Sequence, residues 1–439
     1  MMLEERMQNK LISFIKDIIK KYKDNGMLSI VGVSILNKFI GLVLSIIVVR
    51  LVSKYSYGLY TDASNTCSLF LIFSGLGIKN GILQLCSEER PNKRSLYKFG
   101  LLFGIIANLV ISILLLLYAL SGGMSTEDGK KLLIMMTIIP ITQFIDEYGL
   151  VWLRTRLDNK NYAKATNINS VTNLLFTVSC VHYFGIYGCV LGHVLSSIST
   201  ILYVYTANKR RFQWKEILTD NIKGILKDDD TKVLIKFSLT CTVTNALSSL
   251  LVYLDVFILG KMFLDPTILA SYKASSAIPE AAKFLTATVI TCIYPLFVLN
   301  SKNAKWLRNS ILKLSAFLTI MNSVIAMIMY FGAEQIILII YGEQYLDAVP
   351  VFKVLTISFL VATVVRMPFG NILLMLREEK FNFVLAAFSG VINIILDVVL
   401  IKRYASIGAA VATLSVVVLT SIVSLGRVLW KINRIELNK

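Results

Sequence analysis

The chain has 439 residues, of which 56% are hydrophobic and only 16% are charged, and its mean hydropathy is +0.69. Soluble domains carry about 25% charged residues, so this composition excludes a set of soluble domains. The formal net charge of +18 would suggest nucleic-acid binding in a soluble protein, but here the basic residues lie between apolar blocks. That placement indicates orientation in a membrane, and no nucleic-acid partner is predicted.

The first 26 residues are basic and carry apolar side chains at helical spacing, among them Leu11, Phe14 and Ile18. This pattern predicts an amphipathic helix on an anionic membrane surface, with a loosely ordered basic tail as the alternative. The six cysteines fall in or beside apolar blocks without a C-x-x-C motif, so we interpret them as buried apolar residues. With only two histidines, His182 and His193, no metal site is predicted.

Twelve apolar segments follow, each long enough to cross a hydrocarbon layer of about 30 Å. Long apolar runs with few strand signals predict helices, because every backbone polar group in lipid needs an internal partner. The expected spans are 27–50, 58–85, 98–120, 131–153, 162–184, 186–207, 233–258, 267–298, 309–331, 349–375, 381–401 and 405–430.

The distribution of Lys and Arg sets the predicted orientation of these spans. With both termini inside, most of the 45 basic residues fall in the tail, the inner loops and the linker, and the outer loops hold few. The positive-inside rule therefore predicts a multi-pass membrane protein with both termini cytoplasmic. The outer loops are short, so no large external domain is expected.

The chain also contains an internal repeat. Residues 33–52 align without gaps with residues 241–260, and FGIYGCVL (184–191) aligns with YASIGAAV (404–411). The matches occur in the same order in each half, which argues against chance. The matched pairs are Ser34 with Thr242, Asn37 with Asn245, Arg156 with Arg377, Asn161 with Asn382, Tyr162 with Phe383, and Gly188 with Gly408.

This repeat predicts an N-terminal six-helix bundle over residues 1–208, including the amphipathic tail, and a C-terminal six-helix bundle over 233–439. Residues 209–232 combine a basic run with three successive aspartates and are predicted to form a cytoplasmic linker. An even number of spans in each half predicts a parallel repeat, related by an axis along the membrane normal. The predicted fold class is thus an all-α integral membrane protein of 12 transmembrane helices, with a cleft between two bundles for a ligand that changes sides.

Charged side chains inside the spans indicate a polar cleft, because each costs about 3 kcal/mol at mid-bilayer on insertion scales. The first, seventh and eighth spans each carry a polar stripe on one helical face. The predicted cleft residues are Lys38, Asn37, Lys273, Glu280, Lys283, Arg366 and Asn245. For the charged residues of the eighth span, a salt bridge along the helix is an equal alternative.

Acidic residues in the spans suggest coupling to an ion. Asp62 and Glu280 are candidates for carrying a coupling proton or sodium ion, and no other cofactor is predicted. Asp255 and Asp397 are expected to face the outer interface. No P-loop motif G-x-x-x-x-G-K-[ST] occurs, so direct use of ATP is not expected. Basic groups in a cleft suit an anion, because phosphate oxygens pair well with Arg and Lys.

Three short motifs resemble those of Wzx-type polysaccharide-unit flippases, within the multidrug/oligosaccharidyl-lipid/polysaccharide exporter superfamily. The run RLVSKYSYGLY (50–60) resembles the signature R-x-L-G-P-x-x-Y-G-x-Y after the first helix, with Ser53 and Lys54 departing from its Gly-Pro. SGLGI (74–78) is similar to the family's lGl at the end of helix two. YGEQY (341–345), with Ala348 and Pro350, resembles fG-x-x-Y-x-x-A-x-P before helix ten.

The resemblance implies two six-helix bundles around a V-shaped central cleft. It implies a flippase that moves an undecaprenyl-diphosphate-linked oligosaccharide repeat unit from the inner to the outer leaflet of the bacterial cytoplasmic membrane by alternating access. Cationic cleft residues would hold the diphosphate, and by position these are Lys38, Lys273, Lys283 and Arg366. The implied partners are the lipid-linked oligosaccharide, membrane lipids and other polysaccharide assembly proteins. The polymer itself, O-antigen, capsule or exopolysaccharide, stays open.

Alternative functions also stay open at this point. A flippase for the peptidoglycan precursor would be expected to have more than twelve helices. A multidrug-type antiporter of the same superfamily would share the fold and differ in its substrate. A membrane glycan polymerase or acyltransferase would be an enzyme, but a polymerase would be expected to have large outer loops with Arg or His. We therefore expect a transporter rather than an enzyme.

Overall fold

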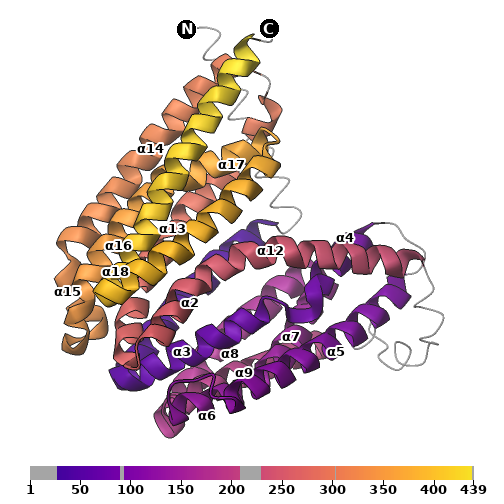
Figure 1. Cartoon of the computed structure of the whole chain (residues 1–439). Coiled ribbons are helices and arrows are strands. Elements are labelled where there is room, and N and C mark those ends of the chain that lie inside the picture. The colour runs from indigo at the N-terminus through magenta and orange to yellow at the C-terminus, as the bar shows by residue number, and fades with distance from the viewer. Residues whose placement is uncertain (1–26, 89–92, 208–228, 302, 438–439) are drawn as a thin grey trace. The chain divides into compact units, whose positions relative to one another are not determined.

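The computed structural model describes residues 27–88, 93–207, 229–301 and 303–437, and all regular structure in these ranges is helical (Figure 1). The predicted amphipathic tail and most of the predicted linker lie outside the described residues. The helices are α2 (Met27–Leu51), α3 (Lys54–Leu71), η1 (Ser74–Gly77), α4 (Ile78–Ser87), α5 (Lys93–Leu120), α6 (Glu127–Met136), α7 (Ile139–Thr155), α8 (Asn159–Phe184), α9 (Tyr187–Ala207), α12 (Asp229–Met262), α13 (Pro266–Leu299), α14 (Ala304–Phe331), α15 (Ala333–Tyr341), η2 (Glu343–Ala348), α16 (Val349–Val361), η3 (Ala362–Arg366), α17 (Met367–Met375) and α18 (Glu379–Leu437).

Within the described ranges, nine helical runs are long and apolar enough to cross a membrane. Each of the twelve predicted spans overlaps a helix, but the correspondence is not one to one. The eleventh and twelfth spans meet at a kink inside α18, where Ala405 leaves helical geometry. Neither α8, which is rich in polar residues, nor α12 is among the nine. The all-helical membrane architecture is therefore confirmed, whereas the count of twelve crossings stays a prediction.

Three of the predicted spans are broken helices, and one of them is the fourth, which consists of α6 and α7. The second consists of α3 and α4 joined by η1, where Gly75 and Gly77 adopt φ of +58° and +71°. A Cβ at Gly75 would lie 2.7 Å from the ring of Phe144, so both space and backbone conformation require glycine there. The tenth span changes from α16 into the π-helical turn η3 and then into α17. Such π-bulges are often found at functional sites.

The repeat predicted from the sequence has matching backbone turns in the structure. Gly185 has φ +57° and ψ −142°, and Ala405 has φ +48° and ψ −129°. Three residues later, a Cβ on Gly188 would lie 2.2 Å from the Cys180 carbonyl carbon, and one on Gly408 would lie 2.2 Å from the Leu400 carbonyl oxygen. The glycines thus allow the same close approach of backbone to backbone at both turns.

A second pair of turns corrects the three sequence matches that share one offset, Arg156 with Arg377, Asn161 with Asn382 and Tyr162 with Phe383. Leu157 (φ +56°) donates its N–H to the Arg154 carbonyl at 3.0 Å, and Arg377 (φ +59°) donates to the Leu374 carbonyl at 3.0 Å. The structure therefore pairs Leu157 with Arg377. The three predicted matches are one residue out of register, because sequence similarity alone did not locate the left-handed position of the turn.

The described residues pack into two compact units. Unit 1 comprises the described parts of 1–44, 73–118 and 135–244, and unit 2 those of 45–72, 119–134 and 245–439. These are packing units, so each draws on both halves of the sequence. The division into repeat halves at 1–208 and 233–439 stays a prediction.

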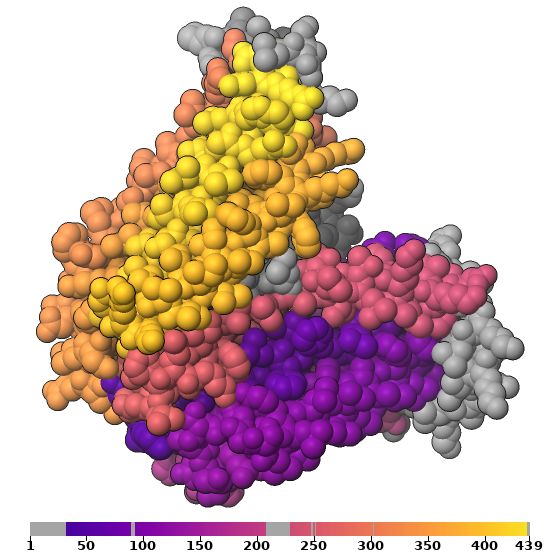
Figure 2. All heavy atoms as spheres, in the orientation of Figure 1, coloured from indigo at the N-terminus to yellow at the C-terminus, as the bar shows by residue number. Residues whose placement is uncertain are grey.

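Each unit has a core of its own. That of unit 1 gathers fully buried residues of α4, α5 and α7, including Ile82, Leu96 and Phe144. Unit 2 has one core around α13, α14 and α17 and another around α12, α13 and α16. In contrast, α14 exposes a row of large apolar side chains, and its outward face lies along one edge of Figure 2. An apolar exposed face is what a lipid-facing helix requires.

Candidate functional site

The predicted cleft residues of unit 1 lie on α2. Lys38 is exposed and makes no ion pair with any described residue. Asn37 is half-buried, and its side-chain oxygen is buried with no donor among the described residues. Both side chains therefore retain unused hydrogen-bonding capacity on a helix long and apolar enough to span a membrane.

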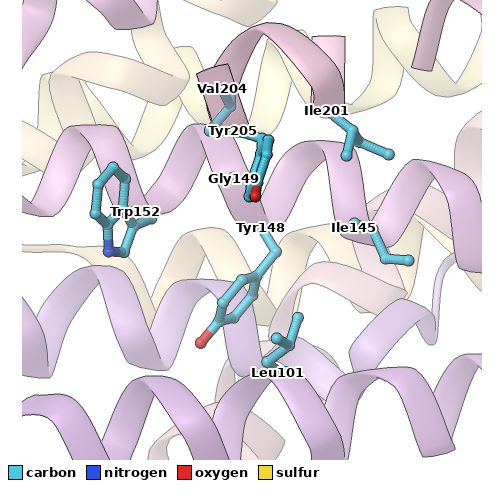
Figure 3. A pocket seen from close by; sticks show the side chains of 8 residues that line it. All are labelled: Leu101, Ile145, Tyr148, Gly149, Trp152, Ile201, Val204 and Tyr205. Atoms are coloured by element: carbon cyan, nitrogen blue, oxygen red, sulfur yellow. The ribbon is translucent and has the colours of Figure 1, made fainter. Parts of the chain in front are cut away.

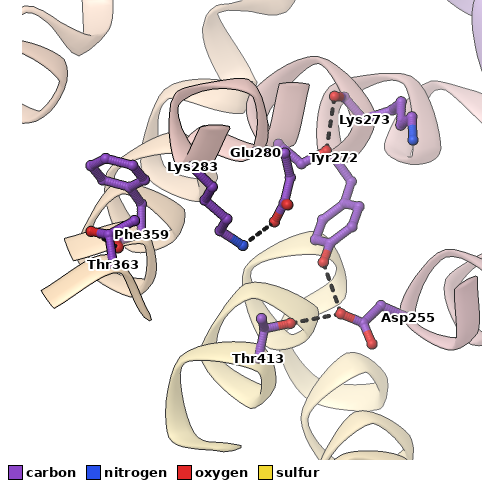
Figure 4. A network of polar contacts seen from close by, with 9 residues as sticks. Asp255, Tyr272, Lys273, Glu280, Lys283, Phe359, Thr363 and Thr413 are labelled. Atoms are coloured by element: carbon purple, nitrogen blue, oxygen red, sulfur yellow. Dashed lines mark hydrogen bonds and ion pairs between the residues drawn. The ribbon is translucent and has the colours of Figure 1, made fainter. Parts of the chain in front are cut away.

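Three predicted residues of unit 2 lie on α13 (Figure 4). The Glu280 carboxylate accepts a hydrogen bond from the Lys283 ammonium at 2.5 Å, so the alternative of a salt bridge along the helix is confirmed for this pair. Lys273, two turns before Glu280, is exposed and has no ion-pair partner within 4.0 Å among the described residues. The face thus carries two ammonium groups and one carboxylate.

Arg366 lies at the end of the π-helical turn η3 and is half-buried. No carboxylate of the described chain pairs with its guanidinium. Gly370, one turn later, leaves space for this group, since a Cβ there would lie 2.7 Å from an Arg366 Nη atom. Asn382 donates to the Gly370 carbonyl at 2.8 Å and so fixes that turn. Arg366 is therefore a positioned cation whose donors are not used by a carboxylate.

The remaining predicted residues of unit 2 are Asn245 and Asp62. Asn245 is exposed on α12. Asp62 is half-buried on α3 and faces α12, where a Cβ on Gly260 would lie 2.8 Å from its carboxylate. Lys38 and Asn37 belong to unit 1 and all the others to unit 2. A shared cleft for these residues accordingly stays a prediction.

The structure also shows a buried polar cluster that the sequence reasoning missed. Asp255 of α12 accepts hydrogen bonds from Tyr272 at 3.1 Å, Asn393 at 2.8 Å and Thr413 at 2.6 Å, partly visible in Figure 4. The same Asn393 amide donates to Asp397 at 2.6 Å. The other oxygen of Asp397 is buried and has no donor among the described residues.

The expectation that Asp255 and Asp397 face the outer interface is therefore wrong. Their exposed fractions are 8% and 0%, because both helices turn these carboxylates toward the hydroxyl and amide groups of unit 2. A signal in the sequence was the i, i+4 spacing of Asn393 and Asp397, which puts both on one helical face. Two buried carboxylates without a basic partner favour the uptake of a proton or a hard monovalent cation, since an isolated buried charge is costly.

The profile of a family described as "Polysaccharide biosynthesis protein" matches residues 25–301. The chain belongs to this polysaccharide biosynthesis family. None of the curated proteins matches the chain.

Solved structures show the fold of this family member at low sequence identity. The chain is similar to the lipid II flippase MurJ in an inward closed conformation, with a TM-score of 0.75 and 16% identity over 94% of this chain and 90% of that one. It is similar to an inward-facing multidrug resistance MATE family transporter of the MOP superfamily, with a TM-score of 0.66 and 14% identity over 91% and 95% of the two chains. A MOP superfamily transporter from Pyrococcus furiosus gives a TM-score of 0.57 and 16% identity over 96% of each chain. The predicted resemblance and the all-helical membrane fold are thus confirmed.

Two of the motifs that carry the resemblance contact each other in this family member. Arg50 donates to the Ile340 carbonyl at 2.8 Å and so satisfies an unpaired carbonyl at the C-terminal end of α15. Lys54 binds the Asp347 carboxylate at 2.6 Å. Gly58 packs against Pro266, whose carbonyl oxygen would lie 1.9 Å from any added Cβ. These motif residues therefore join the end of α2 and the start of α3 to the rest of unit 2 rather than forming a ligand site.

A small cavity in unit 1 is too confined for the expected substrate. It has a volume of about 30 Å³, which is room for about one water molecule. Figure 3 shows its lining, which is largely apolar: Leu101, Ile145, Tyr148, Gly149, Trp152, Ile201, Val204 and Tyr205. We interpret it as a packing void between α5, α7 and α9.

Proposed function

We propose that this chain is a flippase that moves an undecaprenyl-diphosphate-linked oligosaccharide unit from the inner to the outer leaflet by alternating access, for the synthesis of a surface polysaccharide. Membership of the polysaccharide biosynthesis family supports this proposal, as does a fold similar to that of a lipid II flippase and of MATE transporters. The observation that carries it is a set of cations, Lys38, Lys273 and Arg366, which have no ion-pair partner among the described residues and lie on helical runs apolar enough to cross a membrane.

Unpaired cations in a membrane favour an anionic ligand. A lone basic group there costs about 3 kcal/mol or more, and an incoming phosphate offsets that cost by replacing lost solvation with charge-assisted hydrogen bonds. Arg366 suits a diphosphate especially well, because a planar guanidinium can donate two parallel bonds to phosphate oxygens. Gly370 of α17 leaves room for the guanidinium itself, at the end of the π-helical turn.

The multidrug-antiporter alternative is less well supported by these charges. A cationic drug would need an available carboxylate, but Glu280 is already bound to Lys283. The excess of cations over acids among the predicted cleft residues instead favours an anion. An enzyme is also less well supported, because similar solved folds are transporters.

We further propose that transport is coupled to a proton or sodium ion bound at Asp255 and Asp397. This pair supplies the buried oxygen ligands, and the donor-free oxygen of Asp397 gives the ion a place to bind. Asp62 and Glu280 remain weaker candidates, since Glu280 has a lysine partner. We place the protein in the bacterial cytoplasmic membrane with both termini cytoplasmic.

The test uses a strain that lacks the gene and is complemented by variants. We expect Arg366→Gln to abolish surface polysaccharide and to accumulate the lipid-linked unit on the inner leaflet, at unchanged protein level. Lys38→Ala should reduce polysaccharide, and Arg366→Lys should restore part of it because the charge is kept. The matched control is Arg403→Gln, which removes an exposed arginine of the same unit. Full polysaccharide production by Arg366→Gln would refute the proposed role of this residue.

A further inference from the structure

A second group of charged side chains lies inside unit 1, on α4, α7 and α8. The Lys79 ammonium binds the Glu147 carboxylate, whose other oxygen accepts from Gln143 at 2.8 Å. The neighbouring Asp146 accepts from the Asn169 amide at 2.6 Å through one oxygen. Its second oxygen is buried and has no donor among the described residues. The group thus holds two carboxylates and a single ammonium.

The surroundings of Asp146 make an uncompensated charge costly. The residue is only 5% exposed, and its carboxylate faces the Asn169 amide of α8. Lys79 and Glu147 remain partly accessible, with side-chain exposures of 22% and 35%. Breaking the pairing of a buried ion leaves a penalty of several kcal/mol, so an Asp146 carboxylate without a cation needs a neutralising partner.

The choice of partner follows from the ligands available. A metal cation would need several oxygen ligands around it, whereas only one Asp146 oxygen is left without a hydrogen bond. The ammonium of Lys79 lies within electrostatic reach of Asp146 and would repel such a cation. A proton needs a single oxygen and no coordination shell.

We propose that Asp146 is a proton-binding site of unit 1 and that Lys79 controls it by changing partners. With Lys79 bound to Glu147, as in this structure, Asp146 holds a proton as a neutral acid. When Lys79 moves to Asp146, the proton leaves that carboxyl for water, and an ion pair takes its place. Lys79 already lies within electrostatic reach of Asp146, so a change of its side-chain rotamer would bring the ammonium to the second acid. This site goes beyond the proposed transport function, because no substrate contact is involved.

The other elements packed around α7 carry few groups that would interfere. On α8 the group facing Asp146 is the neutral amide of Asn169. The described length of α9 contains His193 as its one group able to become cationic, and η1 has no charged residue. The basic residues of α5 lie in its first six positions: Lys93, Arg94 and Lys98. Lys79 and Glu147 therefore dominate the charge next to Asp146.

The test is infrared difference spectroscopy of the purified full-length protein in lipid nanodiscs during a pH titration. A protonated carboxylic acid gives a C=O stretching band that disappears on ionisation. We expect the wild type to show such a band and Asp146→Asn to lack that component. The Asp397→Asn variant identifies any band from the acid pair of unit 2. Glu378→Gln is the matched control, since that carboxylate is bound to two basic groups.

Two further variants test the role of Lys79 with opposite signs. Lys79→Gln removes the cation that favours the ionised acid, so the band should persist to higher pH, by about one pH unit or more. Glu147→Gln frees Lys79 to bind Asp146, so the band should disappear at lower pH. An unchanged band in Asp146→Asn would overturn the proposal. So would a pH midpoint of the band that stays the same in Lys79→Gln and Glu147→Gln, or that moves in the same direction in both. The infrared band does not depend on polysaccharide transport, so a result against the role of Asp146 can be told apart from a result against the proposed transport function.

Discussion

The acid pair of unit 2 gives the sharpest prediction, because its two aspartates differ in their hydrogen bonds. Asp255 receives donors on both oxygens: Asn393 on one, and Tyr272 and Thr413 on the other. Asp397 accepts a hydrogen bond from Asn393 alone, and its second oxygen has no donor among the described residues. Replacement of each acid by its isosteric amide should therefore have very different consequences for stability.

Asp255→Asn should be strongly destabilising. An amide has one carbonyl oxygen, so if it keeps Tyr272 and Thr413 its NH₂ group faces the NH₂ group of Asn393. The loss of one charge-assisted hydrogen bond costs about 1.5–3 kcal/mol, and the buried donors left unsatisfied cost about 1–3 kcal/mol more. We expect a total of about 3 kcal/mol or more, which is a fall of about 6 °C in apparent Tm at roughly 2 °C per kcal/mol.

Asp397→Asn should change stability by less than about 1 kcal/mol. The amide oxygen can keep the bond from Asn393, and the NH₂ group replaces an oxygen that has no donor. The amide also imitates a protonated or cation-bound acid, so added sodium should stabilise the wild type but not this variant if sodium is the coupling ion. The measurement is thermal unfolding in nanodiscs at fixed pH, with and without sodium. If Asp397→Asn is as damaging as Asp255→Asn, the assignment of the unpaired oxygen to a proton or ion is wrong.

Two other predictions concern stability at the ends and turns of α18. Glu378 lies outside the apolar spans; burial raises the pKa of its carboxyl, but hydrogen bonds from Lys431 and Arg427 lower it more, so the net pKa is below its usual value. Glu378→Gln should therefore destabilise the protein by about 1 kcal/mol at neutral pH. The difference from wild type should shrink as the pH falls below about 4.5 and vanish once the pH is below the lowered pKa of the folded carboxyl; a difference that stays constant with pH would contradict this. Ala405→Gly should raise the apparent Tm, because Ala405 holds a φ of +48° at a cost of about 1 kcal/mol or more, and Gly185→Ala is the reciprocal control that should lower it. Equal effects of the two substitutions would refute that reasoning.

The helices were predictable because their signal is strong and local. A run of about 20 apolar residues can be buried in lipid in few ways, so the twelve predicted segments all overlap helices. The joins between helices were harder to predict. The turn between the last two predicted spans is made by Ala405 rather than by a glycine or a polar loop, so the sequence did not reveal its backbone geometry.

The polar groups of the site were only partly predictable, since a sequence shows which charges lie in spans but not which of them meet. The Glu280–Lys283 pair could be predicted from the sequence, because side chains at i and i+3 on a helix are neighbours. Asp255 and Asp397 were placed at the wrong surface, since they are 142 positions apart and only tertiary packing brings Asn393 between them. The role of η3 in placing Arg366 was also hidden, because a π-bulge leaves no clear mark in composition.

The register of the repeat links the two sites proposed above. Asp146 precedes the turn residue Leu157 by eleven positions, and Arg366 precedes the equivalent turn residue Arg377 by eleven. Equivalent places in the two halves thus hold a buried acid in one and an unpaired cation in the other. Two copies that shared one role would be expected to keep one charge at this place. The opposite charges instead fit different roles for these two positions, in which Asp146 takes up a proton and Arg366 contacts an anionic ligand, and exchanging them in Asp146→Arg combined with Arg366→Asp should not restore transport.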